Sequence, residues 1–205
     1  AVSAWVLACA LSLPVFAQVG GDVIYGDDDR LDLYQVKSPV ILKLADSTVG
    51  LFSASRVKDA DPNGVAQLVT DSYSEDYSLC PEEPFFSQRT GAFCSGSLVG
   101  PDLLMTAGHC VRSESACTGT KFVFGFAITQ EGKNPESVPA SDVYGCAQLL
   151  GREEVGSGAD WALVRLDRPV TGHKPLAINR SGVIEKDTPL MVIGHPAGLP
   201  TKVAG

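Results

Sequence analysis

The stretch FCSGSLVGPDLLMTAGHC, residues 93–110, places a histidine between a run of small residues and a cysteine. The short apolar segments within it are typical of β-strands. A disulfide between Cys94 and Cys110 would tie these strands into a hairpin, and a loop of that length contributes about 3 kcal/mol to stability. The small residues before His109 leave room for a buried neighbour at its imidazole. His109 therefore has the fixed surroundings that a general base requires.

A carboxylate that could orient this imidazole begins the later segment ADWALVRL, residues 159–166. Asp160 is the only charged residue between Glu154 and Arg165, and an unpaired acid beside such an apolar run is costly. A bond from the Nδ1 hydrogen of His109 would satisfy Asp160, fix the tautomer of the ring and support the imidazolium ion. The alternatives are that His109 is a satisfied structural histidine and that Asp160 is a turn residue at the start of a strand.

The TAGHC box, the later D-[aromatic]-A-L strand and the cysteines around the histidine together resemble the chymotrypsin-fold, trypsin-like serine proteases. Residues 23–30, VIYGDDDR, are similar to the N-terminal segment of the bacterial glutamyl-endopeptidase-like branch. Residues 193–200, IGHPAGLP, resemble the turn that precedes the nucleophile region there. The resemblance covers roughly residues 23–205.

This resemblance implies an all-β fold of two six-stranded barrels, with the second barrel incomplete in this sequence. It assigns catalytic roles to His109 and Asp160. We expect residues 18–205 to form the protease domain, with the first barrel at about 35–135 and part of the second at about 140–205. The polar, proline-containing segment 131–141 is the expected boundary between them.

The family's nucleophile occupies a G-[DN]-S-G-[GS] loop that follows the aspartate, and the sequence contains no such loop. Ser157 is too near Asp160 in sequence, Ser181 lacks the preceding glycine, and Ser97 belongs to a strand before the histidine. We therefore expect the nucleophile and the oxyanion hole to lie beyond Gly205, so that the 205 residues alone are inactive. The alternatives are a protease-like, non-catalytic binding protein that has lost the serine, and a purely structural secreted β-domain.

Composition and charge limit the partners of the chain. A formal net charge of −8 without clustered lysine or arginine argues against nucleic acid. Residues 1–17 are uncharged, largely apolar and end in VFA before Gln18, which predicts a cleaved secretory signal peptide. We expect a secreted or periplasmic monomer that acts on a protein or peptide substrate, without stable membrane association. The triad chemistry requires no metal and no organic cofactor.

Export implies that the cysteines after the signal peptide are disulfide partners rather than metal ligands. Spacing and the resemblance pair Cys94 with Cys110. Cys117 with Cys146 is a second candidate pair, which would leave Cys80 for a partner elsewhere, although three cysteines allow other pairings.

Short apolar stretches between turn residues predict strands at 40–44, 49–53, 94–99, 103–106, 121–129, 161–166 and 189–193. Helical turns are expected after His109 and near Ala45. We expect His195 to be a structural histidine, His173 an exposed loop residue and Trp161 a core residue. The acids at 27–29 are expected to form a solvated turn.

Overall fold

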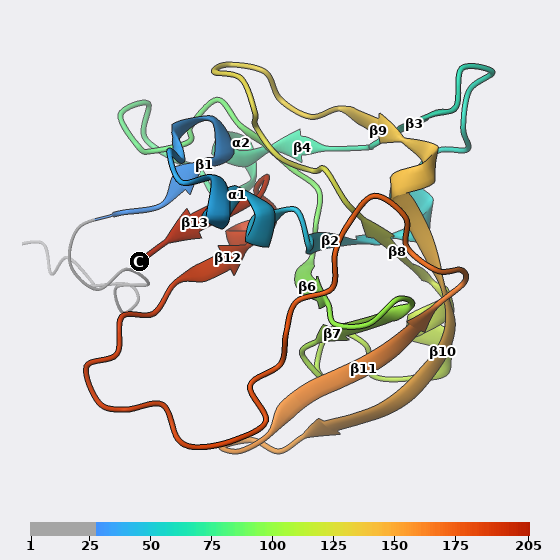
Figure 1. The fold of residues 1–205 in the computed structure, drawn as a ribbon. Helices are drawn as coiled ribbons and strands as arrows, with labels where there is room; N and C mark the ends of the chain where they lie inside the picture. The colour runs from blue at the N-terminus through green and yellow to red at the C-terminus, as the bar shows by residue number, and fades with distance from the viewer. Residues whose placement is uncertain (1–27) are drawn as a thin grey trace, which may run out of the picture.

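The computed structural model describes residues 28–205, so the predicted signal peptide and residues 18–27 lie outside the described part. The described chain is mostly β-structure (Figure 1). The strands are β1 (Leu31–Asp32), β2 (Thr48–Ser53), β3 (Val65–Gln67), β4 (Asp71–Ser72), β5 (Arg89–Thr90), β6 (Cys94–Leu98), β7 (Leu103–Thr106), β8 (Thr120–Val123), β9 (Ser137–Pro139), β10 (Val143–Glu154), β11 (Asp160–Leu166), β12 (Val192–Gly194) and β13 (Lys202–Ala204). The helices are α1 (Pro39–Ala45), α2 (Tyr73–Asp76) and α3 (Glu114–Thr118), with the single 3₁₀ turns η1 (Leu33–Gln35), η2 (Ala54–Arg56), η3 (Ala140–Asp142) and η4 (Pro196–Gly198).

Six antiparallel strands form a closed barrel in the order β10-β11-β7-β6-β2-β8. The predicted hairpin at its centre is present, because β6 pairs with β7 through Gly96 and Thr106. Closure satisfies the backbone of every barrel strand and leaves no free edge. The all-β, chymotrypsin-like fold class expected from the sequence is confirmed.

The expected division of the chain differs from the observed one. β10 and β11 belong to the same barrel as β2, although both follow the boundary predicted at 131–141. β10 makes this closure by changing partners along its length: residues 143–145 pair with β8, and residues from 146 onward pair with β11. The first barrel therefore extends to Leu166, and the segment 131–141 lies between two of its elements.

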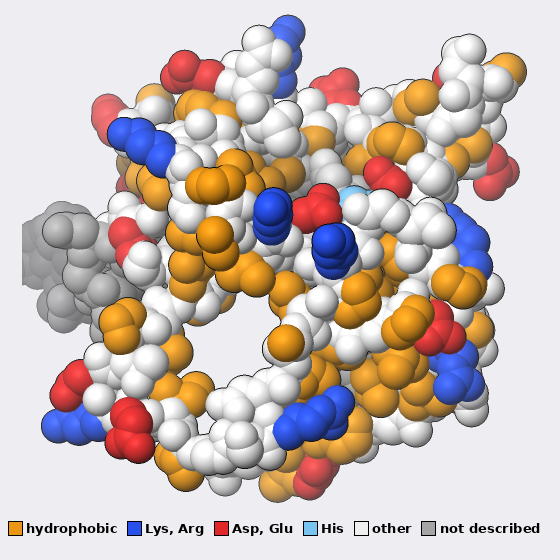
Figure 2. All heavy atoms as spheres, in the orientation of Figure 1, with side chains coloured by type: hydrophobic (Ala, Val, Ile, Leu, Met, Phe, Trp, Pro, Cys, Tyr) orange, Lys and Arg blue, Asp and Glu red, His pale blue; other side chains and the backbone are white. Residues whose placement is uncertain are grey.

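A separate three-stranded sheet in the order β1-β13-β12 lies outside the barrel. Residues 167–191 connect β11 to this sheet and contain no helix or strand (Figure 1). Figure 2 shows an opening framed by this part of the molecule, with hydrophobic side chains along part of its rim. Val183 is 90% exposed and Val192 is 71% exposed.

The predicted strand at 40–44 is wrong, because this apolar run lies in helix α1. Ser38 caps the helix by accepting a hydrogen bond from the backbone N–H of Ile41, and Pro39 occupies the first turn, where its missing N–H costs nothing. The predicted strand at 121–129 ends at Val123, and Gly125 then takes a positive φ of 75° that turns the chain.

The apolar run FVFGF is buried on both sides of the chain. Phe122 and Phe124 pack into the interior of the barrel with Leu51, whereas Val123 and Phe126 pack into a second cluster with Phe52. The four side chains of this run are fully buried. Two cores on opposite faces explain why this segment lacks the alternation of a half-exposed strand. Within residues 28–205, no helix combines the length and apolar character needed to cross a bilayer.

Candidate active site

His109 and Asp160 lie at one end of the barrel because β7 and β11 are neighbours. Ala162 of β11 pairs with Thr106, the last residue of β7, so the start of β11 lies beside the turn that follows β7. His109 is in that turn and Asp160 is the first residue of β11. Two positions distant in sequence therefore meet through strand register.

The Asp160 carboxylate bonds to the ring of His109 and to its backbone. Oδ2 of Asp160 lies 2.6 Å from Nδ1 of His109, and the His109 backbone N–H donates to Oδ1 at 2.9 Å. The hydrogen bond from the His109 side chain, followed by the one from its backbone, lowers the pKa of Asp160 below the ordinary value. With an ionised acceptor at Nδ1, the neutral ring carries its proton there and presents the lone pair of Nε2.

The site is open to solvent in this structure. The side chains of His109 and Asp160 are 50% and 38% exposed. Asp160 is the first residue of β11 and lies at the end of the barrel, which explains its exposure. The apolar residues that follow it, Ala162 and Val164, are the ones that enter the core.

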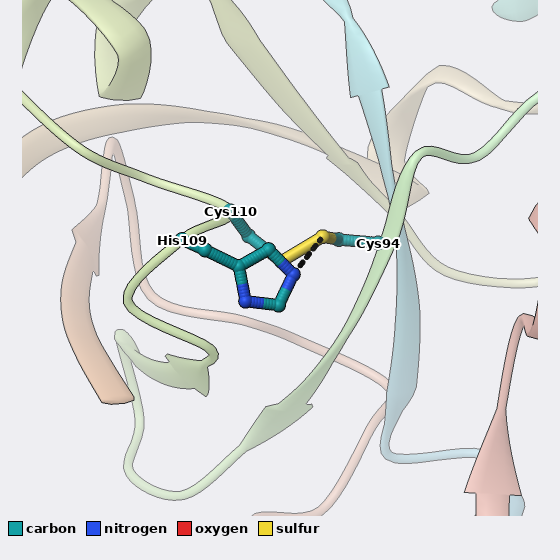
Figure 3. A group of neighbouring side chains, drawn as sticks. All are labelled: Cys94, His109 and Cys110. Atoms are coloured by element: carbon teal, nitrogen blue, oxygen red, sulfur yellow. Dashed lines mark hydrogen bonds between the residues drawn. A yellow bond between two sulfur atoms is a disulfide. The ribbon is translucent and has the colours of Figure 1, made fainter. Parts of the chain in front are cut away.

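A disulfide supports the histidine from the other side. Cys94 and Cys110 are bonded, with Cα atoms 6.2 Å apart, and join β6 to the turn that carries His109 (Figure 3). Nε2 of His109 lies 3.5 Å from Sγ of Cys110 and 3.9 Å from Sγ of Cys94. These three side chains cluster like metal ligands, but thiolates rather than disulfide sulfurs bind metals. The cluster in its disulfide form is therefore a structural support and not a metal centre.

The second candidate disulfide is also present. Cys117 and Cys146 are bonded and join α3 to β10. Among the cysteines that the structure describes, Cys80 alone is free, and it is exposed. Two disulfides fit a protein of an oxidising, extracytoplasmic compartment.

No serine hydroxyl of the described residues hydrogen-bonds to Nε2 of His109. Ser97 lies in β6, where it pairs with Thr48 of β2 and with Met105 of β7. Ser157 lies in the turn between β10 and β11, and Ser181 lies in the segment between β11 and β12. The structure brings together two members of the predicted triad.

The other predicted residues take structural positions. His173 is not an exposed loop residue: its side chain is 12% exposed and stacks on Phe124 at 4.2 Å, with Nδ1 3.0 Å from Oδ1 of Asp46. Trp161 is not a core residue, because it is 38% exposed and donates to Glu153 from its indole nitrogen. Trp161 follows Asp160 at the open end of the barrel, which explains its exposure.

The predicted acidic turn at 27–29 is described only in part, because residue 27 lies outside the described chain. Asp28 binds the guanidinium of Arg30 at 2.7 Å, and Asp29 accepts a hydrogen bond from the backbone N–H of Gly205. These two acids have partners within the chain.

His195 is a buried structural histidine. It is 5% exposed, its Nδ1 lies 3.0 Å from the carbonyl oxygen of Leu199, and its ring stacks against Phe126. Its backbone N–H donates to Oγ of Ser95 at 2.7 Å. Burial lowers the pKa of His195 from 6.5 to about 4.

We expect His195 to make the folded chain sensitive to acid. The unfolded chain takes up this proton near pH 6.5 and the folded protein only near pH 4, so stability is fully present above pH 6.5 and falls between these values. The loss amounts to about 3 kcal/mol by linkage. Urea unfolding at pH 7 and pH 4 should show a smaller loss for His195→Gln than for the wild type. An equal loss in both proteins would contradict this prediction.

Three charged residues near the histidine were not predicted. Arg152 donates from Nε to the carbonyl oxygen of Gly108 at 3.3 Å, and its guanidinium also binds Glu154. Arg112 binds the other oxygen of Glu154 at 3.1 Å. No sequence pattern indicates this group, because arginine and glutamate are ordinary surface residues.

Comparison with known proteins places this chain in a family. The sequence profile of the trypsin-like peptidase domain matches residues 94–204, which include both His109 and Asp160. The chain belongs to the trypsin-like peptidase family. Among curated proteins, this trypsin-like peptidase is 25% identical over 132 residues to chymotrypsin-like elastase family member 3B of Homo sapiens, covering 63% of this chain and 48% of that protein.

Two further relatives show the same likeness. Chymotrypsin-like elastase family member 3A of Homo sapiens is 24% identical over 132 residues, with 63% of this chain and 48% of that protein covered. Member 3B of Macaca mulatta is 30% identical over 84 residues, with 40% and 32% covered. The trypsin-like peptidase chain spans about half the length of the curated relatives it matches.

Proposed function

We propose that this chain is the part of a secreted serine endopeptidase that carries the general base and its orienting carboxylate. The observation that carries the proposal is the double hydrogen bond from His109, ring and backbone, to one carboxylate of Asp160. The nucleophilic serine would lie C-terminal to Gly205. Cleavage of the signal peptide before Gln18 and export belong to the same proposal.

The reaction would proceed by acyl transfer. Nε2 of His109 removes the proton of the serine hydroxyl as its oxygen attacks the peptide carbonyl, and the resulting imidazolium is stabilised by Asp160. The imidazolium then gives that proton to the leaving amine, which leaves an acyl-enzyme. Water, deprotonated by the same histidine, releases the acid and restores the serine. This chemistry needs no metal or organic cofactor.

Exposed apolar side chains support the proposal that further strands of the protein pack beside the site. Val183, Ile184, Leu190 and Val192 are all more than half exposed and lie near or at the three-stranded sheet in sequence. Exposed apolar residues in such number mark a surface that another element covers. The remaining strands of a second barrel would cover them and narrow the open face beside His109.

Labelling with a serine-directed phosphonate tests this function on the full-length protein. We expect one covalent adduct on a serine after Gly205, formed at least about 10²-fold more slowly in His109→Ala. His173→Ala, which changes a histidine outside the site, is the matched control and should be labelled at the wild-type rate. The absence of an adduct, with peptide binding intact, would instead support the protease-like binding protein.

Substrate preference is the finer part of the proposal. The resemblance of residues 23–30 and 193–200 to the glutamyl-endopeptidase-like branch favours cleavage after acidic residues. A peptide panel that varies only the residue before the cleaved bond, with acidic, basic and small apolar side chains, tests this preference. Higher kcat/KM for a basic or apolar residue than for an acidic one would reject it.

A further inference from the structure

The peptide unit that joins Gly108 to His109 is held at both of its polar ends. Its carbonyl oxygen, on Gly108, accepts a hydrogen bond from Nε of Arg152 at 3.3 Å. Its N–H, on His109, donates to Oδ1 of Asp160 at 2.9 Å. A cation and an anion therefore bind opposite ends of one peptide dipole.

The same peptide unit packs closely on the neighbouring strands. A Cβ on Gly108 would lie 2.1 Å from the carbonyl oxygen of Glu153 and 2.9 Å from that of Trp161. Both atoms are backbone, so they cannot move aside without shifting β10 and β11. Glycine is therefore required here, and its lack of a side chain leaves the orientation of the peptide to its hydrogen bonds.

An ion pair with Glu154 holds the side chain of Arg152 in place. Its side chain is 29% exposed and bonds to Oε2 of Glu154, two residues along β10, while Arg112 bonds to Oε1 of the same carboxylate. The guanidinium can serve two acceptors because its N–H groups form a rigid fork. Lysine offers a similar charge but not this geometry.

We propose that Arg152 is a positioning residue, which holds the Gly108–His109 peptide so that Asp160 and the imidazole stay in register. The effect of Arg152 on catalysis rests on the proposed protease function, whereas the placement of the peptide is a property of the folded chain. A cation at the carbonyl polarises the peptide and strengthens the opposite N–H bond to the carboxylate. The direction of Nε2, which the serine would meet, is set by that peptide.

Amide hydrogen exchange of His109, measured by NMR on the full-length protein, tests the placement. We expect the His109 amide to exchange about 10- to 100-fold faster in Arg152→Ala, since one end of the peptide is released. The titration midpoint of the Asp160 carboxyl should move upward in the same variant. Arg152→Lys, which keeps the charge, should fall between wild type and alanine for both readouts.

Arg165→Ala is the matched control. Arg165 lies on β11 and also faces a carboxylate, with its Nε 3.6 Å from Asp102, but it does not bond to the histidine turn. We expect both readouts to be unchanged in this variant. Unchanged His109 exchange in Arg152→Ala, or equal acceleration over the whole barrel, would overturn the inference.

The measurement separates this inference from the proposed function. Failure of phosphonate labelling would reject the protease and leave the exchange result standing. Normal labelling with unchanged exchange would reject Arg152 alone. If Arg152→Ala does not fold, Arg152→Lys compared with Arg165→Lys gives the same test.

Discussion

Asp160→Asn is expected to lower kcat of the full-length protein by about 10⁴-fold, with KM little changed. The carboxylate accepts from Nδ1 of His109 at 2.6 Å. An asparagine amide placed there can present its N–H₂ group to the ring instead, which favours the tautomer with the proton on Nε2. A protonated Nε2 cannot take the proton of a serine.

Peptide hydrolysis by purified wild-type and variant proteins checks this expectation. Asp102→Asn is the matched control, because Asp102 is another partly exposed carboxylate of the barrel, paired with Arg165 rather than with the histidine. Its kcat should stay near that of the wild type. A loss smaller than about tenfold in Asp160→Asn would show that the pair does not act in the rate-limiting chemistry.

Lys202→Met is expected to destabilise the fold by about 3–5 kcal/mol, because it leaves a buried carboxylate without its cation. Nζ of Lys202 donates to Oδ1 of Asp32 at 2.7 Å, to Oε1 of Gln88 at 2.8 Å and to the carbonyl oxygen of Pro200 at 2.9 Å. Lys202 is 2% exposed and Asp32 is 3% exposed. Desolvation lowers the pKa of Lys202, which reflects the cost of holding this charge in the interior.

Urea unfolding measures the loss. Lys43→Met changes an exposed lysine of α1 and should alter the free energy of unfolding by less than about 0.5 kcal/mol. The double variant Asp32→Asn with Lys202→Met removes both charges, so we expect it to be more stable than Lys202→Met alone. Equal stability of Lys202→Met and Lys43→Met would show that the ion pair contributes nothing to folding.

Predictions from the sequence were most accurate where the local pattern of apolar and turn residues agrees with the strand pairing of the fold. The strand predicted at 103–106 has the observed bounds of β7, and the predicted partners His109 and Asp160 meet because β7 and β11 are adjacent. Their catalytic roles remain part of the proposal. Turn residues and apolar segments were sufficient to predict β7, because the β6–β7 hairpin is short and its turn sets the register of its strands.

Other features depend on contacts that no local pattern records. β10 was not predicted, because it pairs with two strands, β8 and β11, along its length. Its register is irregular between Cys146 and Gln148 and between Leu149 and Gly151, and these irregularities remove the alternation of a simple strand. Helix α1 resembled a strand by its apolar residues, whereas the cap at Ser38 decides its structure. The buried pair of Lys202 and Asp32 forms only in the fold, because 170 residues separate the two in sequence.

The pairing of β1 with β13 has a consequence for the order of folding. Leu31 pairs with Val203, so β1, the first strand of the described chain, pairs with β13, the last. The barrel strands all lie between Thr48 and Leu166 and can pair over shorter loops, which close at lower entropic cost. We therefore expect the barrel to form first during synthesis, with β1 unpaired beside it until the residues of β13 have emerged.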